Sequence, residues 1–123
     1  LVDLLHRRGR AQTDAGRHAD ALETYARVRQ LRGDPVSVFL YMDSADSLAA
    51  LSRIEEAAGN WGYLAENAPK GSIPWLVARY RLAALTGPAA AERAALEAEV
   101  RRLEDNPAAG ELVRRARYAL RAG

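Results

Sequence analysis

The chain has 123 residues, the length of one domain with a core of its own. Apolar residues make up 49% and charged residues 28%, which argues against disorder, and no apolar run is long enough to insert in a membrane. The formal net charge of +2 is too small to indicate a polyanionic partner, and the absence of cysteine excludes disulfides and thiol chemistry.

Apolar residues at helical spacing, together with capping and breaking residues, predict seven helices. The first two are expected at about residues 2–15 and 19–31, and the chain breaks after them at Gly16 and Gly33. The inward side of the first helix is expected to carry six residues: Leu1, Leu4, Leu5, Arg8, Gly9 and Gln12.

The third helix is expected to open at Asp34 and Pro35, as an N-cap and a first helical residue. Its short apolar run over residues 36–42 is also compatible with a buried strand, and only the repeat described below favours a helix. Ser52 and Glu55 form a capping box, which places the start of the fourth helix at Ser52.

Three further helices are expected in the rest of the chain. Ser72 can cap the fifth, and the Thr-Gly-Pro sequence at residues 86–88 separates it from a sixth at about residues 88–104. Asn106 precedes the last helix, at about residues 108–121. One apolar stripe and a charged opposite face suit this helix to capping the end of a helical array.

Two copies of one pattern occupy the first half of the chain. Three pairs of residues recur at an offset of 36: Gly9 and Ala45, Ala21 and Ala57, and Tyr25 and Trp61. The small residues allow two helices to approach closely, and the large ring fills the gap that they leave. A fixed period of this size indicates a stacked pair of helices.

This pattern resembles the tetratricopeptide repeat of the bacterial type, a helix–turn–helix unit of about 34 residues. The resemblance implies an all-α protein, built as an α-solenoid of antiparallel helical hairpins in a single domain over residues 1–123. Arg79 falls where the third copy should have a small residue, so that copy is degenerate. The expected parts are repeats at about 2–33 and 35–69, a degenerate repeat at about 73–105 and a capping helix at about 107–121.

No catalytic or metal-binding pattern is evident, so neither enzyme activity nor a cofactor is expected. His6 and His18 belong to no metal-ligand motif and are interpreted as surface or packing residues. Glu55 and Glu56 are adjacent in a helix, so their side chains point about 100° apart and do not form a catalytic pair.

The expected function is that of a protein–protein interaction module or scaffold. The resemblance implies that the first helix of each unit lines a concave groove, which binds a protein segment or another domain of the parent chain. The candidate partner-binding residues are those expected to face away from the packed positions: His6, Arg7, Arg10, Phe39, Met42, Asp43 and Asp46. Methionine suits an adaptable binding surface, although Phe39 and Met42 could instead pack against a neighbouring repeat.

The charge distribution keeps two alternatives open. Residues 1–33 and 75–123 each carry a net charge of +3, whereas residues 34–74 carry −4. The arginine-rich ends are compatible with RNA binding by helical repeats, but the acidic middle makes nucleic acid an unlikely partner. The other alternative is a structural spacer or dimerisation element that associates with itself. The start at Leu1 suggests a segment of a longer protein, and the compartment stays open, with the cytoplasm favoured.

Overall fold

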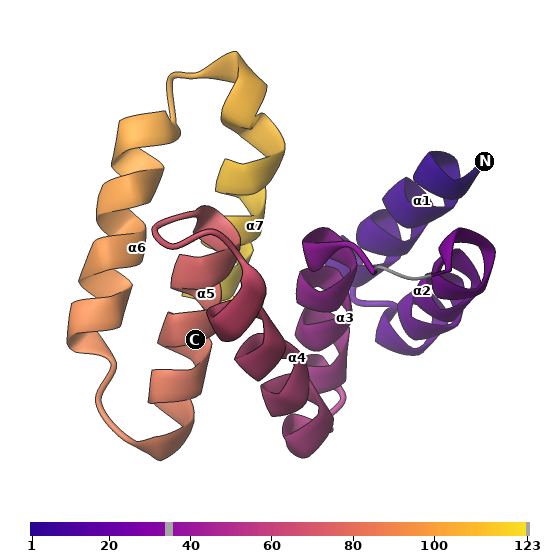
Figure 1. The fold of residues 1–123 in the computed structure, drawn as a ribbon, viewed down its shortest axis with the longest axis horizontal. Coiled ribbons are helices and arrows are strands. Elements are labelled where there is room, and N and C mark those ends of the chain that lie inside the picture. The colour runs from indigo at the N-terminus through magenta and orange to yellow at the C-terminus, as the bar shows by residue number, and fades with distance from the viewer. Residues whose placement is uncertain (34–35, 123) are drawn as a thin grey trace. The chain divides into compact units, whose positions relative to one another are not determined.

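Every regular element in the described residues, 1–33 and 36–122, is a helix (Figure 1). This computed structural model confirms the expected all-α class, and residues 38–42 of the run that was also compatible with a strand lie in the third helix. The helices are α1 (Val2–Asp14), α2 (His18–Arg32), α3 (Val38–Ala50), α4 (Ile54–Asn67), α5 (Ile73–Thr86), α6 (Ala90–Leu103), the 3₁₀ turn η1 (Pro107–Ala109) and α7 (Gly110–Ala122).

The helix starts follow the predicted caps in part. Ser72 accepts a hydrogen bond from the backbone N–H of Trp75 at 3.4 Å, as a cap of α5 should. The predicted start of the third helix at Asp34 and Pro35 lies outside the described residues. In the described residues, α3 begins at Val38, where the Ser37 side chain accepts a hydrogen bond from a backbone N–H within the first turn.

The turn between α3 and α4 has the same backbone hydrogen bonds as the turn between α1 and α2, displaced by 36 residues. Gly16 and Ser52 occupy the matching position in the left-handed region, with φ of 80° and 62°. In the first turn the N–H groups of Ala15, Gly16 and Arg17 donate, in that order, to the carbonyls of Ala11, Thr13 and Gln12. In the second turn the N–H groups of Leu51, Ser52 and Arg53 donate, in that order, to the carbonyls of Ser47, Ala49 and Leu48.

The start of α4 predicted from a capping box at Ser52 and Glu55 is therefore wrong by one residue. The N–H of Ala57 donates to the Arg53 carbonyl at 3.1 Å, so Arg53 is the N-cap of α4, and Ser52 belongs to the turn before it. Each of the two turns is followed by an exposed i,i+3 ion pair at the start of the next helix. These pairs are Arg17–Asp20 at 2.9 Å and Arg53–Glu56 at 2.5 Å.

The connection between α5 and α6 departs from this turn. Pro88 has no backbone N–H and cannot donate the bond that Ser52 donates 36 residues earlier. The C-cap residue Gly87 has an extended backbone instead, with φ of 166°. The third hairpin is thus built by a different turn, although its two helices form as expected.

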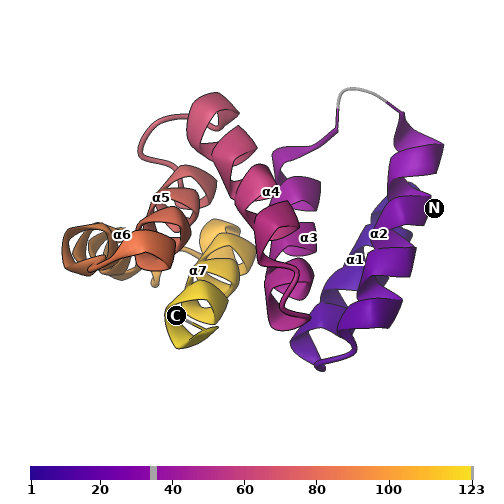
Figure 2. The same ribbon diagram turned by 90° about the horizontal axis from the view of Figure 1, so that it is seen from below.

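The chain divides into two compact units, Leu1–Asn60 and Trp61–Gly123, and the boundary falls inside α4. In unit 1, α1 and α2 lie side by side and α3 packs against both (Figure 2). In unit 2, α5, α6 and α7 pack against one another. Arg93 connects them, because its Nη1 donates to the Tyr80 hydroxyl at 2.7 Å and to the Leu120 carbonyl at 3.1 Å. The single domain expected over the whole chain stays a prediction.

The residues of the 36-residue pattern are all buried, as expected: Gly9, Ala21, Tyr25, Ala45, Ala57 and Trp61. The prediction was wrong for Leu1 and Leu4, which are 82% and 65% exposed, and for Arg8, which is also exposed. The buried side of α1 carries Gly9 and Gln12, three residues apart, and Leu4 and Arg8 lie about 100° away from that side because each directly precedes a residue on it.

At Gly9, α1 lies close against the Tyr25 ring of α2. A Cβ atom built on Gly9 would lie 2.5 Å from Cε1 of the Tyr25 ring, which is closer than non-bonded atoms allow. The ring cannot move away freely, because it is buried and its hydroxyl shares a hydrogen bond of 2.7 Å with Thr13. The absence of a side chain at Gly9 therefore sets the distance between the two helices.

We expect Gly9→Ala to destabilise the fold by about 1–3 kcal/mol through overpacking, although alanine is the better helix former. Gly59→Ala is the matched control, because Gly59 is exposed in a helix interior with no foreign atom within 4 Å of a built Cβ. It should stabilise by about 0.5–1 kcal/mol. Urea denaturation measures both changes, and stabilisation by both substitutions would contradict the close approach.

Candidate functional site

A cluster of charged side chains joins α1 to α3 inside unit 1, and Arg10 is at its centre. The Arg10 Nη1 donates to Asp43 Oδ1 at 3.0 Å and to Asp46 Oδ2 at 2.8 Å, and Nη2 lies 3.1 Å from Asp14 Oδ1. His6 Nε2 donates to the other oxygen of Asp43 at 2.8 Å. Arg10, Asp43 and Asp46 are buried. We call the five residues His6, Arg10, Asp14, Asp43 and Asp46 the Arg10 cluster.

The Arg10 cluster keeps its arginine charged. Burial by itself would lower the pKa of Arg10, but the carboxylates of Asp46 and Asp43 outweigh this effect and raise the pKa above its usual range. A buried carboxylate without a counter-ion is costly, and a guanidinium that donates to two carboxylates offsets that cost. The cluster thus stabilises one arrangement of α1 on α3.

A chain of hydroxyl groups continues from the cluster toward α2. Thr13 Oγ1 shares hydrogen bonds with the Tyr25 hydroxyl at 2.7 Å and with Ser47 Oγ at 2.8 Å, and Ser47 also contacts His18 Nδ1 at 3.0 Å. Burial, followed by the charge of Asp43, raises the pKa of Tyr25, so its hydroxyl stays protonated. Ser47 is fully buried, and its hydroxyl is therefore enclosed among these partners.

The structure corrects the exposure expected for the candidate partner-binding residues. Four of the seven are buried rather than exposed: Arg10, Met42, Asp43 and Asp46. The three charged ones are buried because the Arg10 guanidinium pairs with both carboxylates across two helices, and Met42 is buried in the core rather than on a binding surface. Arg7 is exposed, whereas His6 and Phe39 are partly buried.

Sequence reasoning missed the pairing within this set. Arg10 and Asp46 occupy the same position in the two copies of the 36-residue pattern, and they carry opposite charges. Equivalent positions of stacked units lie next to each other along the array, so opposite charges one period apart are a signal of an ion pair between units. The expectation that Arg10 and Asp46 are exposed considered each helix by itself and so did not include their opposite charges.

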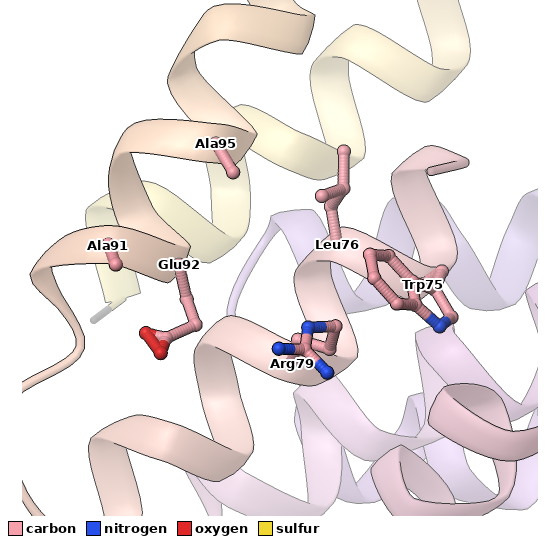
Figure 3. A pocket seen from close by; sticks show the side chains of 6 residues that line it. All are labelled: Trp75, Leu76, Arg79, Ala91, Glu92 and Ala95. Atoms are coloured by element: carbon pink, nitrogen blue, oxygen red, sulfur yellow. The ribbon is translucent and has the colours of Figure 1, made fainter. Parts of the chain in front are cut away.

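Unit 2 has an open pocket between α5 and α6, with a volume of about 250 Å³ (Figure 3). Trp75 and Arg79 stand side by side on α5, with the guanidinium carbon 4.7 Å from the centre of the indole ring. Glu92 reaches in from α6, on which small residues form the opposite wall. The lining residues are Trp75, Leu76, Arg79, Ala91, Glu92 and Ala95.

The pocket offers an apolar interior with charges of both signs at its margin. The indole ring and the alanines can contact an apolar group, while Arg79 and Glu92 can pair with charged neighbours of that group. None of these six residues was among the candidates derived from sequence. Arg79 had been noted only as a misfit at the small-residue position, and that misfit was the available signal.

Comparisons with protein-family models, with curated proteins and with solved structures found no match to this chain. In the residues that the structure describes, no helix is long and apolar enough to cross a membrane. The same residues contain no group of three or more histidine, aspartate or glutamate side chains arranged to hold a metal ion.

We expect Asp46→Ala to lower the free energy of unfolding by about 3–5 kcal/mol, because it removes one partner of a buried ion pair. Asp20→Ala is the control, since it breaks the exposed pair with Arg17 and should cost less than about 1 kcal/mol. Chemical denaturation compares the two. Equal and small effects would show that the Arg10 cluster adds nothing to stability. Charge reversal at Asp43 or Asp46 would also break the buried ion pairs with Arg10, so a loss of partner binding in such a variant could reflect unfolding.

Stability should also depend on the protonation of His18. Burial, with a smaller effect of the Arg10 charge, lowers the pKa of His18 below its usual value of 6.5. The unfolded state then binds more protons than the folded state between the two pKa values, so this contribution is complete above the unfolded pKa and is lost as the pH falls. Urea denaturation from about pH 7.5 to about pH 5 should show this loss, and His18→Gln should reduce it. If the free energy of unfolding of His18→Gln fell with pH as steeply as that of the wild type, His18 would not be the source of this pH dependence.

Proposed function

We propose that this chain is a protein-interaction module of the tetratricopeptide-repeat type, in which helical hairpins present a binding surface to a segment of a partner protein. The recurrence of the same turn after 36 residues supports this proposal. So does the burial of the small and aromatic residues at the same offset. Repeated hairpins of this kind bury one face against their neighbours and leave the other to a partner.

The observation that carries the proposal is the open pocket of unit 2. Tryptophan and arginine are enriched among the residues that dominate binding energy at protein interfaces, and here they are stacked at the edge of one pocket. The volume of about 250 Å³ lies below the roughly 300–1,000 Å³ of typical small-molecule sites. A single side chain of a partner protein fits this size better than a cofactor does.

The lining defines the partner segment that we expect. An aromatic or long aliphatic side chain contacts the Trp75 ring and the alanines, and charged residues on either side of it pair with Arg79 and Glu92. The candidates derived from sequence contribute less than expected, because Arg10, Met42, Asp43 and Asp46 are buried. Arg7, His6 and Phe39 remain candidates for an additional contact with a partner.

The test uses a displayed library of random linear peptides selected on the wild-type protein. Ala95→Leu fills the pocket from an exposed position and should weaken the enriched peptides at least about tenfold, a loss of roughly 1.4 kcal/mol. Ala94→Leu is the matched control, since Ala94 is also exposed on α6 but does not line the pocket. It should change affinity less than about twofold, and Trp75→Ala should weaken binding as Ala95→Leu does.

Two results would favour the alternative functions. Salt-sensitive binding of a random RNA pool, with no enrichment of peptides, would support the RNA-binding interpretation, since affinity for phosphates falls steeply with salt. If the protein bound neither the RNA nor the peptides, and its molecular mass in solution rose with its concentration, a self-associating structural element would be supported. Enriched peptides that bind equally to Ala95→Leu would place the interaction outside this pocket.

A further inference from the structure

Unit 2 contains a second stack of arginine on tryptophan, and this one is buried. Arg81 of α5 lies over the Trp61 ring, with its guanidinium carbon 4.6 Å from the ring centre. Arg81 is 8% exposed and Trp61 is 2% exposed. Both residues belong to unit 2, and neither lines the pocket described above.

Arg81 differs from the other buried arginines in its lack of a carboxylate. Arg10 pairs with Asp14, Asp43 and Asp46, and Arg115 lies 3.5 Å from Glu111. Within residues 1–33 and 36–122, no carboxylate forms an ion pair with Arg81. Its Nε and the indole Nε1 of Trp61 are also enclosed without a hydrogen-bond partner among these same residues.

A buried guanidinium without a counter-ion is unfavourable, because it has lost its water and gained no negative charge in return. The face of the Trp61 ring compensates part of this loss through cation–π attraction, but it satisfies none of the five N–H donors of the guanidinium. Arg81 keeps an exposed fraction of 8%, so part of the residue still borders solvent.

We propose that Arg81 and Trp61 form a binding site for a small oxyanion, namely a phosphate or carboxylate group. The planar fork of the guanidinium donates two parallel hydrogen bonds to such a group, a geometry that a monatomic anion cannot match. The net charge of unit 2 favours an anion as well, since residues 61–123 contain ten basic and seven acidic side chains. This site is independent of the peptide pocket and of the function proposed for it.

The binding test follows Trp61 fluorescence and the melting temperature during titration with inorganic phosphate, and separately with acetate, against chloride at constant ionic strength. Trp75→Phe serves as the background, because the chain has two tryptophans and this change leaves Trp61 as the sole emitter. We expect a saturable change with either oxyanion, and the tighter of the two identifies the group that the site takes. The general stabilising effect of phosphate on proteins is common to all variants and cancels in their comparison.

Arg81→Met should weaken the saturable binding at least tenfold. Arg79→Met is the matched control, because Arg79 also stacks on a tryptophan but is exposed, and it should leave the binding within twofold. A wild-type protein without saturable binding, an Arg81→Met variant that binds as well as wild type, or an equal loss in both variants would overturn the proposal.

A second measurement does not depend on the folding of Arg81→Met. The Nε–H resonance of Arg81, assigned by its absence from Arg81→Lys, should shift in proportion to occupancy as phosphate or acetate is added to the wild-type protein. The resonances of exposed arginine side chains should shift far less. An Arg81 Nε–H resonance that does not respond to either anion would overturn the proposal even if fluorescence changed.

Discussion

The packing of unit 1 depends on the guanidinium of Arg10, which lies between Asp43 and Asp46 and ties α1 to α3. Apolar contacts alone tolerate small shifts of one helix along another, because they have no direction. The hydrogen bonds from Arg10 to Asp43 at 3.0 Å and to Asp46 at 2.8 Å do not tolerate such shifts, because a shifted helix would leave the carboxylates buried without a cation. The Arg10 cluster therefore selects one register of α1 on α3, and the hydroxyl chain through Thr13 and Ser47 extends that selection to α2.

The seven helices were predictable because their signals are local. Apolar spacing, glycine breaks and serine caps act within a few residues of each other, and the small and aromatic residues repeat at one offset. The burial of Asp43 and Asp46 was not predictable in that way. A helical projection assigns a charged residue to solvent, since charges are rarely buried alone. Their burial depends on a cation in another helix. For Asp46 the signal is visible when residues 36 positions apart are compared for opposite charge, whereas Asp43 lies 33 residues from Arg10 and gives no such signal.

Residue type alone also fails to predict the conformation of the turns. Ser52 adopts the left-handed conformation that Gly16 adopts 36 residues earlier, although serine has no special tolerance for it. The recurring backbone bonds around each turn determine the conformation, and the residue type only modifies its cost. A capping rule that considers Ser52 by itself therefore places the start of α4 one residue early. Pro88 has the opposite effect at the next connection, because the missing N–H removes a bond that no neighbour can replace.

Arg10 of unit 1 has different neighbours from Arg79 and Arg81 of unit 2, and this difference bears on where binding occurs. Unit 1 places Arg10 among carboxylates of its own chain, so that positive charge is already neutralised inside the fold. In unit 2 both Arg79 and Arg81 lie on indole rings, which attract a cation without neutralising it. The α6 residues that line the pocket with Arg79 are Ala91, Glu92 and Ala95, whereas Leu96 and Val100 of the same helix are buried. Helix α5 of unit 2 thus carries two ring-stacked arginines, and one of them, Arg79, lines the pocket that can admit a side chain.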